Sequence, residues 1–278
     1  MSNAALENLL KRDRRIVVAA IVVLTALAWI YLIWLSRHVS MAVPSMPSMP
    51  DMPDMPDMPG MKISTAVTPM LRAWTAGDFA FIFLMWAIMM VGMMTPSAAP
   101  MILIYSRVAR QSAQDGRPLA STGWFVVGYL LGWTAFSLVA AIAQGILARM
   151  AWLTPMMAAT SNKVGGCVLI VAGIYQFTPL KNRCLSQCQS PFAFIQSHGG
   201  FKRGMKASVQ LGLRHGFYCI GCCWALMALL FAGGVMNILW VAAIAVHILI
   251  EKVLPEGKAI ARVIGALLAV AGLWLLFK

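Results

Sequence analysis

The chain has 278 residues, of which 60% are hydrophobic and only 11% are charged, and its formal net charge at pH 7 is +13. A soluble domain carries about 25% charged residues, so this composition excludes an ordinary water-soluble enzyme. The 22 Lys and Arg residues lie in short clusters between apolar stretches, a pattern typical of membrane-protein loops and not of a nucleic-acid-binding surface. We therefore expect a polytopic membrane protein in contact with the lipid bilayer, with no nucleic-acid partner.

Seven apolar stretches are long enough, or nearly so, to cross ~30 Å of hydrocarbon as helices. The sequence thus predicts an all-α fold, a polytopic bundle of about seven transmembrane helices. It divides into a cytoplasmic tail with the first helix (1–35), an extracytoplasmic linker (36–78) and a six-helix membrane domain (79–278) that carries the candidate metal site. The stretches lie at about 16–35, 79–105, 122–147, 164–180, 208–232, 237–254 and 260–277.

The basic residues predict the orientation of these helices. If the N-terminus is cytoplasmic, sixteen of the Lys and Arg residues fall on the cytoplasmic side and six on the other. This asymmetry is a strong positive-inside signal, which places the N-terminus inside and the C-terminus outside. The expected location is the bacterial inner membrane, and the first apolar stretch is interpreted as a retained anchor because it exceeds the usual signal-peptide core.

The predicted linker contains a tract rich in methionine and proline. Proline at every third residue excludes a helix and favours polyproline II, whose three residues per turn place the methionines in one column. Neighbouring sulfurs in a straight tract would be about 9 Å apart, too far to share one ion. Two interpretations stay open, metal capture by thioethers, which select Cu(I), and an inert spacer. The column consists of Met46, Met49, Met52, Met55, Met58 and Met61.

The fifth apolar stretch contains an imidazole and three thiols on one helix face. At 100° per residue, His215, Cys219, Cys222 and Cys223 fall within a stripe of about 100°, with Met227 just beside it. Thiolate, thioether and imidazole ligands together suit Cu(I), and zinc is the alternative with Cys and His alone. The same stripe also fits a redox site, or cysteines that serve as small packing residues.

The sixth apolar stretch carries His247 and Glu251 one turn apart, and ionisable residues within a membrane segment usually face the bundle interior. A glycine-containing turn at 233–237 predicts an antiparallel hairpin between the fifth and sixth stretches. This hairpin places His247 level with Gly221, between Cys219 and Cys223, and Glu251 close to His215, so His247 and Glu251 are candidate metal ligands. Glu251 lies near the predicted cytoplasmic end, and a capping or snorkelling role stays open for it.

The second apolar stretch adds further sulfur. Met85, Met89 and Met93 repeat every four residues, at the predicted depth of the thiols. Pro96 and Pro100 predict a kink in this helix. We interpret Met89 and Met93 as ligands that pass a metal inward, with plain packing as the alternative.

Two more cysteines, Cys184 and Cys188, lie in a predicted cytoplasmic loop. A C-x-x-x-C pair there is either an acceptor for the metal or two reduced thiols.

These residues together resemble a bacterial family of predicted metal-binding integral membrane proteins, domain of unknown function 2182. The resemblance spans about 80–256 and implies metal binding within the membrane, whereas the methionine tract lies outside it. The matching pieces are Met85-Trp86-Ala87-Ile88-Met89-Met90, Met93-Met94-Thr95-Pro96 and Pro100, Tyr175-Gln176, Pro179-Leu180-Lys181, Cys184, Cys188, His215-Gly216, Cys219, Gly221-Cys222-Cys223-Trp224, Met236-Asn237 and Glu251-Lys252.

The sequence therefore predicts a membrane protein that binds Cu(I), for copper transport or for delivery to a membrane cuproenzyme. A metallochaperone or the cuproenzyme itself is the expected partner. No catalytic residue is assigned, and the sequence lacks a P-loop. Two alternatives stay open, a metal-independent membrane thiol oxidoreductase that uses Cys219 and Cys222, and an accessory subunit of a membrane complex.

Overall fold

The computed structural model describes residues 3–42, 75–114, 121–150, 152–153, 160–201 and 203–278. The regular elements in these ranges are all helices, which confirms the all-α class. The helices are α1 (Asn3–Ala42), α2 (Ala76–Gln114), α3 (Thr122–Arg149), α4 (Asn162–Gln176), α5 (Pro179–Gln189), α6 (Pro191–Ser197), α7 (Met205–Gly233), α8 (Ile238–Val253) and α9 (Gly257–Phe277).

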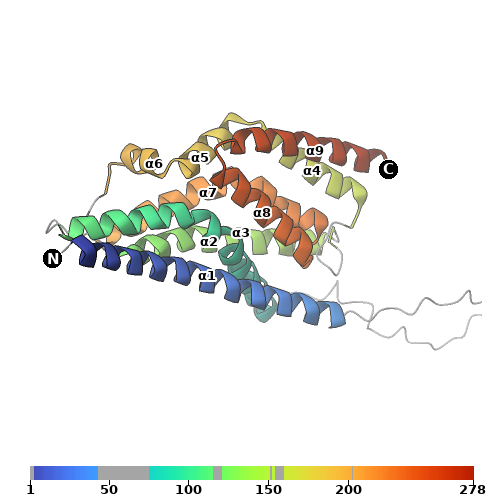
Figure 1. Cartoon of the computed structure of the whole chain (residues 1–278). Coiled ribbons are helices and arrows are strands. Elements are labelled where there is room, and N and C mark those ends of the chain that lie inside the picture. The colour runs from blue at the N-terminus through green and yellow to red at the C-terminus, as the bar shows by residue number, and fades with distance from the viewer. Residues whose placement is uncertain (1–2, 43–74, 115–120, 151, 154–159, 202) are drawn as a thin grey trace, which may run out of the picture.

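The long helices form a bundle in which α1 and α2 lie on one side and α4 and α9 lie on the other (Figure 1). Helices α3 and α7 run between these two pairs, and the pairs α3–α7, α4–α9, α1–α2 and α2–α3 make the most extensive contacts. The N-terminus and the C-terminus lie at opposite ends of the bundle, and α1 ends on the side of the C-terminus (Figure 1).

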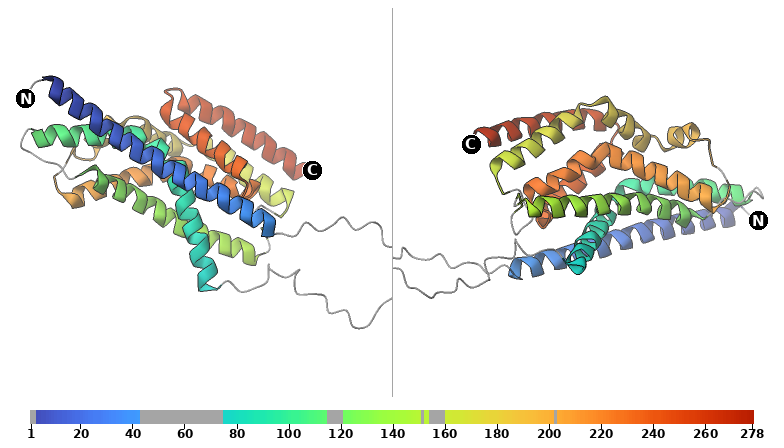
Figure 2. Two further views of the ribbon diagram at one scale, coloured as in Figure 1. Left: turned by 60° about the horizontal axis from the view of Figure 1, so that its bottom comes forward. Right: turned by 180° about the vertical axis from the view of Figure 1, so that it is seen from behind.

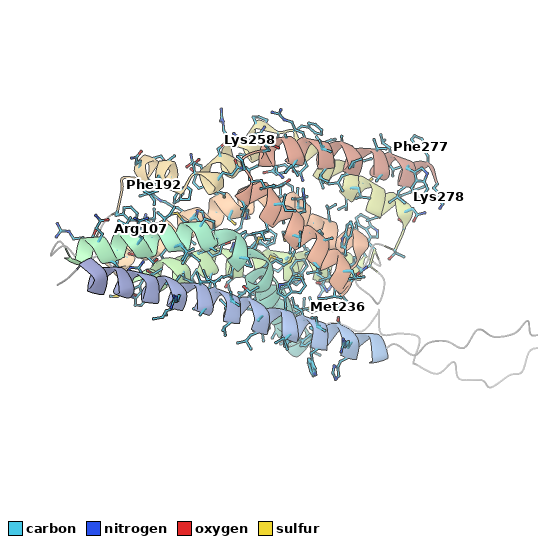
Figure 3. The ribbon with its side chains drawn as sticks, viewed as in Figure 1. Arg107, Phe192, Met236, Lys258, Phe277 and Lys278 are labelled. Atoms are coloured by element: carbon cyan, nitrogen blue, oxygen red, sulfur yellow. The ribbon has the colours of Figure 1, made fainter. Side chains whose placement is uncertain are left out.

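Within the described residues, five helices are long and apolar enough to cross a membrane, or up to six if the bent pair α4 and α5 counts as one span. The remaining predicted stretch, 237–254, forms α8, whose 16 residues extend about 24 Å. The count of seven spans and the orientation of the N-terminus therefore stay predictions. Large apolar side chains also cover the outside of the bundle, for example Leu239, which is 78% exposed. Figure 3 shows Phe277 and Lys278 at the opposite end of the bundle from Arg107.

Helix α7 packs against α3 through two glycines on each helix, four residues apart. A Cβ atom added at Gly132 would lie 3.6 Å from the Cα of Gly216, and one added at Gly216 would lie 3.2 Å from the carbonyl oxygen of Tyr129. The other two members of the contact are Gly128 and Gly212. Small residues at this spacing allow helix backbones to touch, so they set how closely α7 approaches α3.

Helix α2 contains Pro96 and Pro100 within its length and is bent (Figure 2), which confirms the predicted kink. Pro96 has no N–H, so the carbonyl of Gly92 loses its helical donor. The indole Nε1 of Trp29 in α1 donates to this carbonyl at 3.3 Å. The kink thus leaves a polar group that α1 satisfies, which ties α1 to the bundle.

The turn between α7 and α8 forms the predicted antiparallel hairpin. Gly234 has a φ of 92°, in the region that favours glycine. Asn237 caps α8, because its side-chain oxygen accepts from the backbone N–H of Trp240 at 3.3 Å. The hairpin brings α8 back along the bundle toward the end where α7 begins (Figure 1).

Candidate metal centre

The three cysteines of α7 are buried in the interior of the bundle. Cys219, Cys222 and Cys223 are each 1% exposed. The thiols of Cys222 and Cys223 donate to the carbonyl oxygen of Cys219 at 3.1 and 3.0 Å. The predicted stripe therefore faces inward, and two of its thiols are engaged with the helix's own backbone.

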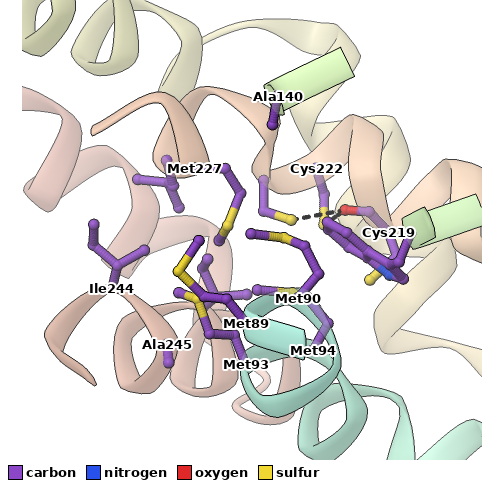
Figure 4. Close-up of a cluster of buried hydrophobic side chains, with 14 of the residues drawn as sticks. Met89, Met90, Met93, Met94, Ala140, Cys219, Cys222, Met227, Ile244 and Ala245 are labelled. Carbon is purple, nitrogen blue, oxygen red and sulfur yellow. Dashed lines mark hydrogen bonds between the residues drawn. The ribbon is translucent and has the colours of Figure 1, made fainter. Parts of the chain in front are cut away.

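Methionines from α2 and α7 surround these thiols. Figure 4 shows Met89, Met90, Met93 and Met227 gathered with Cys222 in one cluster between the two helices. Each of the four methionines is 1% exposed or less. We call this group of buried thiols and thioethers the sulfur cluster. Its members are Met89, Met90, Met93, Met227, Cys219, Cys222 and Cys223.

A buried ammonium group lies directly beside Cys219. The Nζ of Lys252 donates to the Sγ of Cys219 at 2.7 Å and to the hydroxyl of Ser97 at 3.1 Å, and it lies 4.0 Å from the sulfur of Met94. The hydroxyl of Tyr129 lies 3.3 Å from the same Sγ. Lys252 thus supplies the positive charge that a thiolate at Cys219 would require for compensation.

Lys252 was not among the residues predicted for the metal site. The sequence analysis counted it among the cytoplasmic basic residues and within the Glu251-Lys252 pair of the family resemblance. The available signal was a basic side chain in the last turn of an apolar stretch, because an ionisable residue inside a membrane segment is a functional candidate by default.

The prediction that Cys184 and Cys188 lie in a loop was wrong, because both are on helix α5. Thr178 caps this helix by accepting from the backbone N–H of Lys181 at 3.3 Å, and Pro179 occupies its first turn. Helices α4 and α5 meet at a bend of 65°. The capping residue followed by proline was the sequence signal for this second helix start.

The bend carries the α5 thiols to the face of α7. A Cβ atom added at Gly221 would lie 2.8 Å from the Sγ of Cys184, so this thiol packs where α7 has no side chain. The half-buried thiol of Cys188 packs against the core that contains Cys219 and Cys222 and lies close to their thiols. The chain's two groups of cysteines therefore meet at one place.

His247 and Glu251 belong to a polar cluster that includes Lys181. The Nε2 of His247 lies 2.9 Å from a carboxylate oxygen of Glu251, and the Nζ of Lys181 donates to both carboxylate oxygens at 2.8 and 3.0 Å. Lys181 also donates to the side-chain oxygen of Gln176. The side chains of Lys181 and Glu251 are 0% and 2% exposed. This cluster ties α8 to α5, and a metal-ligand role for His247 and Glu251 stays a prediction.

His215 lies one turn before Cys219, among aromatic rings. The rings of Phe125, Tyr129 and Phe194 have centroids 6.1, 5.8 and 5.3 Å from that of His215. Its Nδ1 is buried and has no hydrogen-bond partner in the described part of the chain. An unpaired ring nitrogen at this position is a group that a ligand would satisfy.

The donor set fits a soft metal ion, although its side chains require a rearrangement to hold one. Among the described residues, no three Cys, His, Asp or Glu side chains already stand in a metal-binding arrangement. Rotation of Cys222 and Cys223 away from the Cys219 carbonyl would free both thiols for an ion. The methionine column of residues 46–61 lies outside the described residues.

A buried cluster of thiols and thioethers in a helical bundle defines a protein equipped for a soft metal. The chain matches the model of the family described as PpoB2, copper chaperone, over residues 83–275. The match covers more than half of the sequence, so the chain belongs to this copper chaperone family. It includes the whole sulfur cluster and leaves out α1 and the methionine tract. No curated protein and no solved structure matches the chain.

Proposed function

We propose that this protein is a membrane-embedded copper chaperone that holds Cu(I) in the sulfur cluster and delivers it to a membrane cuproenzyme. The observation that carries this proposal is the convergence of buried thiols and thioethers from α2, α5 and α7, with Cys184 of α5 packed against Gly221 of α7, within the region that matches the copper chaperone family. The copper ion is cargo, and the protein's task is to bind it and release it.

The chemistry of the cluster favours Cu(I) over other ions. Thiolates and thioethers are soft ligands that select Cu(I), whereas hard ions require oxygen ligands. The buried carboxylate near the site, Glu251, is already paired with Lys181. Zinc prefers a tetrahedral set of Cys and His ligands, to which the methionines would contribute little.

The proposed roles follow the position of each group. The methionine column of residues 46–61 collects the ion outside the membrane. Met89, Met93 and Met227 pass it inward, and the three α7 cysteines hold it together with His215 and His247. Cys184 and Cys188 of α5 receive it on the cytoplasmic side or return it from there.

Membrane embedding is part of this proposal. It is supported by the five to six long apolar helices and by the apolar side chains that cover the outside of the bundle. The positive-inside distribution of Lys and Arg favours a cytoplasmic N-terminus in the bacterial inner membrane.

The proposal is tested by the copper content of detergent-purified protein after anaerobic loading with Cu(I), measured by plasma mass spectrometry. We expect the wild type to retain copper and the Cys219/Cys222/Cys223→Ser variant to lose the copper held by the sulfur cluster, because the thiolates are the strongest ligands. Cys167→Ser is the matched control, since Cys167 is an exposed cysteine on α4. Deletion of residues 44–61 should lower the amount of copper bound without emptying the sulfur cluster. Absence of copper from the wild type would refute the proposal.

One observation favours a second candidate, a thiol oxidoreductase. Cys188 lies close to Cys219 and Cys222, so thiols from two helices are brought together, as a thiol oxidoreductase requires. Met89→Leu with Met93→Leu separates the two functions. A copper chaperone should lose copper affinity in this variant, whereas a metal-independent oxidoreductase should keep its full thiol-exchange rate.

A further inference from the structure

A small cavity lies between α1, α2 and the start of α8, next to the sulfur cluster. Three methionines line it, Met85 and Met89 from α2 and Met236 from the turn between α7 and α8. The rest of its wall consists of apolar side chains and of Ser36 in α1. Figure 3 shows Met236 beside α1.

The size and the lining of this cavity suit a single ion without its water shell. Its volume is about 10 Å³, at the lower limit of what a single water molecule needs. A water molecule there would need two to four polar partners, and the hydroxyl of Ser36 is already directed to the carbonyl of Ile33 at 3.0 Å. The lining therefore offers thioether sulfur as its main ligand type.

The three thioethers are in a position to act together. Met85 and Met89 are one helical turn apart and each 1% exposed, and Met236 approaches from another element and is 8% exposed. A methionine side chain has three rotatable bonds, so all three sulfurs adjust to one centre at low cost. Uncharged thioethers select Cu(I) and the chemically similar Ag(I).

The cavity lies between an end of the bundle and the sulfur cluster. Ser36 precedes the end of α1, Ala42, by six residues, or about 9 Å along the helix. On the inner side, Met89 lines the cavity and also belongs to the sulfur cluster (Figure 4). Met93 follows one turn further along α2, at a rise of about 6 Å.

From this geometry we propose that Met85, Met89 and Met236 form a loading site that binds Cu(I) before the thiols do. This inference rests on the proposed copper function and adds a site to it. The ion keeps its oxidation state as it moves inward. It exchanges thioether ligands for cysteine sulfurs, which release their protons when they bind the metal.

The test uses the full chain with Met85→Leu and Met236→Leu combined, which leaves Met89 and every cysteine in place. Leucine nearly conserves the volume of methionine, so the fold should tolerate both changes. Met101→Leu is the matched control, because Met101 is equally buried on α2 but does not line the cavity. Met236→Leu alone is the milder variant, since it changes only the turn.

The first measurement is the anaerobic rate of Cu(I) uptake from a Cu(I)–bicinchoninate complex. We expect uptake to slow about tenfold in the double variant, a factor that corresponds to about 1.4 kcal/mol. The final copper content should equal that of the wild type and of Met101→Leu. An uptake rate equal to that of the wild type in both cavity variants would overturn the loading site.

The second measurement is Ag(I) binding in the Cys219/Cys222/Cys223→Ser background from which residues 44–61 are also deleted, so that the thioethers of the methionine tract do not contribute. We expect a weak site to persist there and to vanish when Met85→Leu and Met236→Leu are added. Unchanged Ag(I) binding after these additions would also overturn the loading site. A wild type that takes up no copper would instead refute the proposed function itself, so the two failures are distinguishable.

Discussion

Two neighbouring residues of α8, Glu251 and Lys252, have opposite charges and separate partners. Successive residues of a helix point about 100° apart, so one faces Lys181 on α5 and the other faces Cys219 on α7. The carboxylate neutralises a buried ammonium, whereas the Lys252 ammonium lies against a thiol. Within this single turn of α8, Glu251 therefore pairs with α5, whereas Lys252 lies beside the sulfur cluster.

Replacement of Glu251 by Gln should destabilise the protein strongly. The Lys181 ammonium would remain buried without its counter-charge, and breaking such a pair from one side costs about 3–5 kcal/mol. Chemical or thermal unfolding of the purified protein in detergent measures this loss.

The paired substitution Lys181→Met with Glu251→Gln is the control for that prediction. It removes both charges, so most of the stability should return, and copper content should stay at the wild-type level if Glu251 only balances charge. Unaltered stability of Glu251→Gln alone would contradict the assigned ion pair.

Among the elements, the sequence predicted best those features that depend on local chemistry. The proline pair indicated the bend in α2, and the glycines with Asn237 indicated the α7–α8 turn, because each acts through its own backbone. Helix α5 was missed because its polar composition looked like a loop. The bend of 65° that carries it to α7 depends on packing between distant segments.

The close contact of α3 with α7 also had a visible sequence pattern, glycine pairs four residues apart in both stretches. The pattern indicates that each of these helices packs closely against another helix, but it does not specify which one. The pairing arises from the packing of the whole bundle.

Gly212→Leu should separate α3 from α7. A Cβ atom at Gly212 would already lie 3.0 Å from the backbone nitrogen of Tyr129, so a leucine has no room. We expect a loss of about 3 kcal/mol in the free energy of unfolding, together with lower copper content because α7 moves with its cysteines. The control is Gly123→Leu, where the nearest atom is a serine hydroxyl at 3.6 Å. Equal stability of both variants would show that the α3–α7 contact tolerates side chains.

At the scale of the whole molecule, helix periodicity alone predicted that the three α7 cysteines share one face. All three thiols are buried in the structure, as expected if that face points into the bundle. The additional groups, Cys188, Tyr129 and Lys252, come from three other helices. Their proximity depends on how α3, α5 and α8 are rotated about their axes, which the sequence pattern does not specify.

The orientation in the membrane is testable with reporter fusions at the two termini. These ends lie on opposite sides of the bundle (Figure 1), and the basic residues favour a cytoplasmic N-terminus. A green fluorescent protein fused to the N-terminus should therefore fluoresce, whereas alkaline phosphatase should be active at the C-terminus. Phosphatase activity from an N-terminal fusion would contradict this orientation.

The contact between Lys252 and Cys219 also bears on the valence of the cargo. In an apolar interior, an assembly of charges is stable only when its members sum to nearly zero. With Cys219 and Cys222 as thiolates and Cys223 as a neutral thiol, which already donates to the Cys219 carbonyl, a monovalent ion beside one ammonium would be electroneutral. A divalent ion on the same two thiolates would leave one uncompensated positive charge. In the proposed site the Lys252 ammonium would therefore favour the reduced ion over the divalent one without touching the metal.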